Sequence, residues 1–157
     1  MEQEFVRRLS DETRYFRFMD TVRELTPRML SHFTQVDHDL HVALIAVTGT
    51  GAGESELAVA RYVTAADGRS CEFAIVVADD WQGKGLGARL MSALLAAARA
   101  AGLCVVYGEV LATNARMLRF VTRLGFAVRP DGADPRLMRV ELQLGSRDAG
   151  ETRARRE

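Results

Sequence analysis

The stretch that decides the fold is Ala-Asp-Asp-Trp-Gln-Gly-Lys-Gly-Leu-Gly-Ala-Arg, residues 78–89. It follows an apolar run at 71–77, which predicts a buried strand, and it leads into a helical repeat at 85–101. The stretch contains three alternate glycines, Gly83, Gly85 and Gly87. Glycines let backbone N–H groups approach a ligand, and a helix N-terminus adds unpaired donors and a partial positive charge. The pattern therefore predicts a loop that binds a phosphate or pyrophosphate.

Two other interpretations of this loop stay open at this point. One is a plain strand-to-helix turn. The other is a dinucleotide fingerprint, because Gly83–Ala88 fits G-x-G-x-x-[GA] and Glu109 follows near the end of the next strand. Five residues separate Val77 from Gly83, however, and hairpin-joined strands precede the loop rather than a βαβ unit. These features disfavour nicotinamide dinucleotide binding.

The rest of the chain predicts an α+β domain with a mixed sheet. The first twenty residues suit one or two amphipathic helices, and Thr26 before Pro27 marks a helix start. The helical repeat at 85–101 places Leu90 and Leu94 on one face, with Met91 beside it. The remaining expected elements are strands at 42–47, 56–63, 71–77, 103–110, 126–129 and 136–144, and helices at 27–34 and 114–124.

Composition limits the class of protein. The 157 residues, 48% hydrophobic and 27% charged, predict one soluble domain over 1–144 and a disordered polar tail over 145–157. Twenty-one basic residues balance 21 acidic ones, which gives no indication of nucleic-acid or membrane binding. Cys71 and Cys104 lie in apolar runs without metal-site spacing, which predicts reduced thiols and a cytoplasmic location. The N-terminal stretch has no apolar core of a signal peptide.

Two motifs in this order resemble the GNAT superfamily of N-acetyltransferases. The first is [QR]-x-x-G-x-[GA] between a strand and a long helix, here Gln82-Gly-Lys-Gly-Leu-Gly87. The second is an asparagine that opens a helix ending in Gly-Phe, here Asn114 to Phe126. The resemblance implies the GNAT fold: a mixed, mostly antiparallel sheet of about six strands flanked by about four helices. It also implies acetyl-CoA as cosubstrate and no metal.

The chain is most similar to bacterial protein lysine acetyltransferases of the Pat type, through FVRRLSDETRYFRFM, LTPRMLSHFTQVD and EFAIVVADDWQGKGLG. In that family the domain is often fused to an acyl-CoA-synthetase-like or nucleotide-sensing domain, so we expect either a standalone enzyme or an excised domain. The resemblance assigns cofactor contacts to the backbone of Ile75, Val76 and Val77, to Asn114, and to the loop residues Gln82, Gly83, Lys84, Gly85, Leu86, Gly87 and Ala88. It also implies that the strands at 71–77 and 103–110 splay apart around pantetheine.

The reaction requires a neutral amine. A free lysine has a pKa near 10.4, so only about one in 2,500 is neutral at pH 7, and deprotonation costs roughly 4.6 kcal/mol. A carboxylate base is therefore expected. Glu72 stands where Pat-type enzymes place their base, and Glu109 stands where some ribosomal-protein acetyltransferases place theirs. The tyrosine acid common in the family is replaced by Val121, so the thiolate would leave unprotonated or take a proton from water.

The resulting hypothesis is direct acetyl transfer in a ternary complex to a primary amine, with a protein lysine as first candidate. The alternatives are a small amine, such as a polyamine or an antibiotic, and a non-catalytic acyl-CoA-binding regulatory domain. We expect a monomer or homodimer. Trp81 is expected to pack beneath the loop, and the cluster Asp37-His-Asp-Leu-His41 is expected to be a polar loop and strand edge rather than a metal site.

Overall fold

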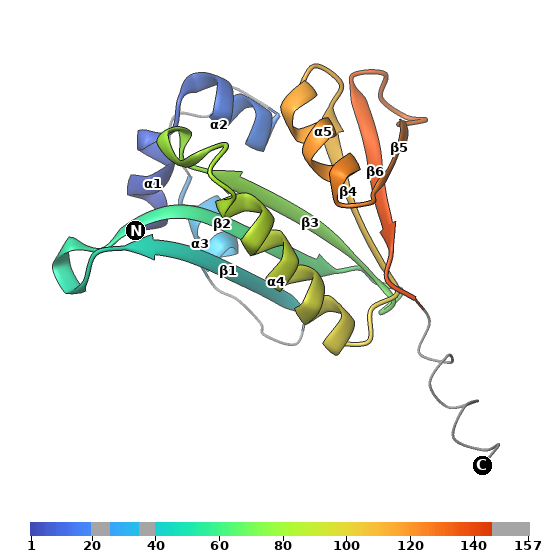
Figure 1. Ribbon diagram of the computed structural model, residues 1–157, viewed down its shortest axis with the longest axis horizontal. Coiled ribbons are helices and arrows are strands. Elements are labelled where there is room, and N and C mark those ends of the chain that lie inside the picture. Colours follow the sequence, from blue (N-terminus) through green and yellow to red (C-terminus); the bar gives the residue numbers. More distant parts are fainter. Residues whose placement is uncertain (20–25, 35–39, 146–157) are drawn as a thin grey trace, which may run out of the picture. The chain divides into compact units, whose positions relative to one another are not determined.

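The computed structural model describes residues 1–19, 26–34 and 40–145. Six strands form one sheet in the order β1-β2-β3-β4-β6-β5. Strands β3 and β4 pair in parallel, while β1/β2, β4/β6 and β5/β6 are antiparallel. The prediction of an α+β fold with a mixed, mostly antiparallel sheet is therefore confirmed (Figure 1). The strands are β1 (His41–Thr48), β2 (Ser55–Thr64), β3 (Ser70–Val77), β4 (Val105–Leu111), β5 (Ala127–Pro130) and β6 (Leu137–Gln143).

The described residues form five α-helices, one more than expected, because the first segment folds as two. The helices are α1 (Glu2–Arg8), α2 (Asp11–Phe18), α3 (Pro27–Thr34), α4 (Leu86–Ala100) and α5 (Ala115–Arg123), with 3-10 turns η1 (Gly51–Gly53) and η2 (Asp79–Trp81). Three of the helices have a side-chain cap at the N-terminus: Ser10 caps α2, Thr26 caps α3 and Asn114 caps α5. The sequence had predicted the helix starts at Thr26 and Asn114, but not the cap at Ser10. Gly102 and Gly125 follow α4 and α5 with φ of 78° and 94°, the left-handed conformation in which helices commonly end.

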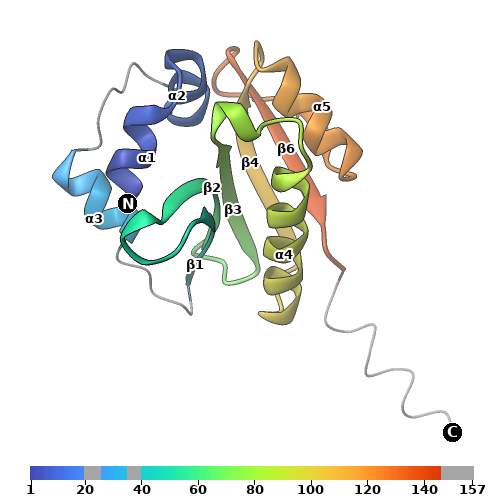
Figure 2. The same ribbon diagram turned by 60° about the vertical axis from the view of Figure 1, so that its left-hand side comes forward.

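The chain is organised as two compact units, and both β3 and α4 run through the two. Within the described part of the chain, the first unit comprises residues 1–19, 26–34, 40–63 and 74–94. Its apolar core joins Phe5, Val6 and Leu9 of α1 to Val59 of β2 and Val76 of β3. Figure 2 shows α1 and α3, which are in contact, beside each other in this unit. Burial of these side chains holds α1 against the strands, because each Å² of apolar surface removed from water stabilises the fold by about 25 cal/mol.

The hairpin of β1 and β2 contains a β-bulge. Ala46 pairs with Ala58, but Val47 pairs with Glu56, so Leu57 is an extra residue in β2. A bulge interrupts the regular alternation of side chains between the two faces of a strand. Leu57 and Glu56 are both buried, and the bulge therefore changes which residues of β2 point towards α1.

The second unit comprises residues 64–73 and, within the described part of the chain, 95–145. Its centre is the pairing of β4 with β6, and Val106 and Val140 are almost fully buried there. Gly108 lets the backbone of β4 approach the Phe73 ring, since an added Cβ would lie 2.8 Å from that ring. The Phe73 ring in turn packs against Phe126, with 5.3 Å between their centroids.

The buried face of α4 differs from the expected one. Met91, Leu94, Leu95 and Ala98 are buried, whereas Leu90 is only half-buried. The buried face of α4 is thus centred closer to Met91, which was expected to lie beside it, than to Leu90. Among the described residues, none of the helices combines the length and the apolar character that a membrane span requires.

Candidate active site

The glycine loop leads from η2 into α4 in the first unit. Gly83 and Gly85 have φ of 74° and 85°, a left-handed conformation that glycine adopts at little cost. A Cβ added to either glycine would meet nothing within 4 Å, so the backbone above the loop is open to a ligand. The Gly85 carbonyl accepts the N–H of Arg89 at 3.2 Å, which begins the hydrogen bonding of α4.

The loop fits a pyrophosphate. All seven residues predicted from Gln82 to Ala88 lie in this one turn, and Leu86 and Gly87 form the first residues of α4. The helix N-terminus supplies N–H donors and a partial positive charge. Lys84 and Arg89 are exposed beside it. An open backbone with these charges is the donor set that a diphosphate requires.

The strand before the loop carries the other predicted cofactor contacts. Ile75 and Val76 are buried, and Val77 is half-buried. The Val77 carbonyl accepts a hydrogen bond from Gln82 Nε2 at 3.0 Å. The Gln82 side chain therefore braces the end of β3 against the start of the loop. Contact between these backbone groups and pantetheine stays a prediction.

The two predicted bases lie in the second unit, on one face of neighbouring strands. Glu72 of β3 pairs with Tyr107 of β4, and Glu109 follows two residues later, so its side chain shares the face of Tyr107. Both glutamates are exposed. Glu109 pairs with Arg139 across the β4/β6 ladder. The structure thus brings Glu72 and Glu109 to the same polar face.

Sequence reasoning did not assign a role to two further groups on this face. The Arg139 guanidinium lies over the Tyr107 ring, 4.3 Å from its centroid. Burial raises the pKa of the Tyr107 phenol, and the negative charge of Glu72 raises it further. Tyr107 therefore keeps its proton at neutral pH. The alternation of β4 already placed Tyr107 beside Glu109, but only the pairing with β6 reveals Arg139.

The Asn114 side chain caps α5. Its Oδ1 accepts the N–H of Met117 at 3.1 Å, and the residue is 9% exposed. The side-chain amide nitrogen is a donor that the cap does not use, and we expect it to make the predicted contact with the cofactor arm. Val121, at the usual position of the family's tyrosine, is fully buried. An acid at this position would lie in the core.

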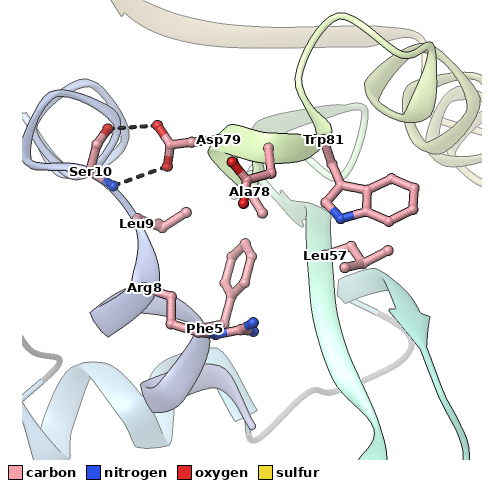
Figure 3. A pocket seen from close by; sticks show the side chains of 9 residues that line it. Phe5, Arg8, Leu9, Ser10, Leu57, Ala78, Asp79 and Trp81 are labelled. Atoms are coloured by element: carbon pink, nitrogen blue, oxygen red, sulfur yellow. Dashed lines mark hydrogen bonds between the residues drawn. The ribbon is translucent and has the colours of Figure 1, made fainter.

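A cavity of about 350 Å³ adjoins η2 in the first unit (Figure 3). It is lined by Phe5, Arg8, Leu9, Ser10, Leu57, Ala78, Asp79, Asp80 and Trp81. Trp81 was expected to pack beneath the glycine loop, but its side chain lines this cavity and is 39% exposed. The Lys84 ammonium lies 5.2 Å from the ring centroid. Trp81 thus contacts the loop through Lys84, as expected, but its ring is partly exposed rather than buried.

The cysteines are free thiols, and burial raises the pKa of Cys71 to about 12. Such a thiol is a poor nucleophile, since the thiolate is the reactive form. Within the described ranges there is no group of three or more His, Cys, Asp or Glu side chains that could hold a metal. The predicted polar cluster at Asp37–His41 falls mostly outside the described residues, as does nearly all of the predicted tail.

Comparisons with known proteins agree with this geometry. Residues 5–126 match the acetyltransferase (GNAT) family model. An acetyltransferase of Pseudomonas aeruginosa is 34% identical over 85% of this chain and 72% of its own length. The acetyltransferase Pat of Mycolicibacterium smegmatis is 36% identical over 74% of this chain, which spans 34% of that relative's length.

Solved structures extend the likeness to three dimensions. The GNAT domain of S. lividans PAT superposes with a TM-score of 0.81 at 27% identity, over 90% of this chain and 82% of that one. The Salmonella typhimurium protein yncA, solved with its cofactor acetyl-CoA, gives a TM-score of 0.50 at 29% identity, over 57% of this chain and 59% of that one. The chain therefore belongs to the GNAT family of acyl-CoA-dependent N-acetyltransferases.

Proposed function

We propose that this enzyme transfers the acetyl group of acetyl-CoA to a primary amine, and that the preferred acceptor is a protein lysine. The open glycine loop supports acetyl-CoA as the donor, because its backbone and charges suit the pyrophosphate. When bound, acetyl-CoA supplies a thioester that is activated towards amines. Similarity to the Pat domain supports lysine as the acceptor. We also propose a cytoplasmic location and a monomer or homodimer.

The polar face of the second unit carries the acceptor proposal. Glu72 and Glu109 present exposed carboxylates on neighbouring strands: Glu72 lies opposite the half-buried Tyr107, and Glu109 follows Tyr107 by two residues. An acceptor amine arrives as an ammonium ion, which carboxylates attract. The amine must then lose a proton at a cost of roughly 4.6 kcal/mol for free lysine at pH 7. Exposed carboxylates on this face supply both the attraction and a route for the proton.

We assign the base to Glu72 and treat Glu109 as the alternative. Glu72 opens the same strand that leads into the glycine loop, so one strand carries both the base and the predicted pantetheine backbone. Glu109 lies on β4, opposite Arg139 of β6, and is not part of the strand that leads into the glycine loop. Tyr107, which keeps its proton, is placed to hydrogen-bond an acceptor on this face.

The first test is ligand binding by thermal shift. Acetyl-CoA at 100 times its dissociation constant adds about 2.7 kcal/mol to the stability. For a protein of this size the midpoint should rise by about 5–10 °C. NAD serves as the control, since the dinucleotide interpretation of the loop predicts a shift with NAD instead. No shift with acetyl-CoA would refute the donor assignment.

The second test measures release of coenzyme A with lysine peptides, polyamines and aminoglycosides. Glu72→Gln should lower kcat at least tenfold with peptide acceptors, while the dissociation constant of acetyl-CoA stays unchanged. Glu109→Gln, which removes the same charge from the same face, should have a smaller effect. If a small amine reacts faster than any peptide, the proposal that a protein lysine is the preferred acceptor is wrong. If kcat is unchanged in Glu72→Gln, Glu72 is not the base.

A further inference from the structure

The corner between α1 and α2 is hydrogen-bonded to the segment that precedes the glycine loop. Ser10 lies between α1 and α2 and is the N-cap of α2, where its Oγ accepts the N–H of Thr13 at 3.1 Å. Its backbone N–H donates to Asp79 Oδ2 at 3.0 Å, and its hydroxyl donates to Asp79 Oδ1 at 2.6 Å (Figure 3). The Thr13 hydroxyl donates to the same Oδ1 at 2.8 Å. One carboxylate thus accepts three hydrogen bonds from residues 66 and 69 positions earlier in the chain.

The network continues to the first residue of the cofactor motif. Gln82 Nε2 donates to Thr13 Oγ1 at 3.3 Å and to the Val77 carbonyl at 3.0 Å. The Thr13 hydroxyl accepts from Gln82 and donates to Asp79, so the directions of these bonds are compatible. Asp79 and Gln82 are the two ends of the turn that contains Trp81. Both ends of the turn are therefore held by the same helix corner.

The charge of Asp79 strengthens this arrangement. Partial burial alone would raise the pKa of the carboxyl, but the hydrogen bonds from Ser10 and Thr13 outweigh burial and lower it. Asp79 is thus ionised at neutral pH. Hydrogen bonds to an ionised group are shorter and roughly twice as strong as neutral ones.

We propose that Asp79 is a positioning residue for the cofactor loop: by binding Ser10 and Thr13, its carboxylate fixes the turn before Gly83 and holds the loop ready for the pyrophosphate. The physical reason is entropic. Gly83 and Gly85 give the loop the conformation it needs, but glycines also make it costly to order. Fixing one end of the loop before binding lowers that cost. This proposal rests on the proposed function, since it assumes that the loop binds acetyl-CoA.

The test is calorimetric binding of acetyl-CoA to the full chain. Asp79→Asn and Asp79→Ala should weaken binding about tenfold, and KM for acetyl-CoA should rise while kcat at saturation stays near the wild-type value. Asp80→Asn is the matched control, because it removes an adjacent exposed carboxylate and should bind as the wild type does. Thr13→Val should weaken binding in the same way, whereas Thr13→Ser, which keeps the hydroxyl, should restore it.

A purely structural role predicts a different result. In that case Asp79→Asn and Thr13→Val would lower the thermal midpoint but leave the dissociation constant unchanged, which would overturn the proposal. If Asp79→Ala fails to fold, the dissociation constants of Asp79→Asn and Thr13→Val decide between a positioning role and a purely structural one. If the wild type binds no acetyl-CoA, the proposed function fails and this inference fails with it. If the wild type binds and the variants bind equally well, only this inference fails.

Discussion

Glu56 should make the stability of the enzyme depend on pH near neutrality. Its side chain is 1% exposed, and neither carboxylate oxygen has a hydrogen-bond partner among the described residues. Burial and then the nearby charge of Glu2 raise its pKa from 4.5 to about 7, against the opposing effect of Arg61. The folded protein therefore binds this proton more tightly than the unfolded chain does. Stability is highest below about pH 4.5 as far as this group is concerned, and it falls as pH rises through about 7.

The size of the effect follows from the pKa. A rise from 4.5 to about 7 corresponds to about 3 kcal/mol, at 1.36 kcal/mol for each pH unit. Glu56→Gln replaces the protonated carboxyl with a neutral group of the same shape, which does not titrate. The variant should match the wild type to within about 1 kcal/mol at pH 5 and exceed its stability by about 2–3 kcal/mol at pH 8. The thermal midpoint should then be higher by about 4–12 °C at pH 8.

The assay is thermal or urea unfolding of both proteins from pH 5 to pH 8. Glu54→Gln is the matched control, because Glu54 is an exposed carboxylate two residues earlier and should follow the wild-type profile. The reasoning is refuted if the stability difference between Glu56→Gln and the wild type is the same at every pH. Such a result would mean that Glu56 is equally charged in the folded and unfolded states.

Three further predictions concern backbone sites and domain organisation. Gly85→Val should abolish the thermal shift with acetyl-CoA, because a β-branched residue resists the left-handed conformation of the loop. The control is Gly51→Val in the β1/β2 hairpin, where φ is 57°; this variant should have similar backbone strain but bind acetyl-CoA normally. Gly108→Ala should destabilise the protein by about 1–3 kcal/mol in urea unfolding, since its Cβ would lie 2.8 Å from an aromatic ring. Gly132→Ala, where nothing lies within 4 Å, is its control and should be neutral. We also propose that residues 1–144 unfold as one domain, which predicts a single calorimetric transition; two transitions would assign the two units to separate domains.

Local sequence signals predicted most of the fold. The strand and helix around the glycine loop lie within a few residues of their expected positions, because short-range periodicity and glycine stops determine them. The helix face was less accurate: Leu90 is as apolar as Met91, and only the packing around α4 decides which of them is buried. Propensity does not contain that information.

In the candidate site, too, the local features could be predicted from the sequence and the long-range contacts could not. The cofactor loop is contiguous in sequence, so its residues could be assigned from one stretch. Arg139 lies 32 positions after Tyr107, and Asp79 lies 69 positions after Ser10. Contacts of this kind depend on strand register and on how a helix corner meets a turn. Neither follows from a single sequence, whose local pattern shows only that Ser10 can cap a helix.

The bulge at Leu57 has a consequence for insertions and deletions in this hairpin. In a regular strand Glu56 and Arg61, an odd number of residues apart, would point to opposite faces. With one extra residue between them, both act on the same buried environment beneath α1, where Glu2 pairs with Arg61 at 3.0 Å. Deleting Leu57 would remove the bulge and leave Glu56 four residues from Arg61, so the two side chains would still share a face of β2. Homologues that lack this residue should therefore still tolerate a glutamate at the position of Glu56, because the shorter strand keeps its side chain on the buried face with Arg61.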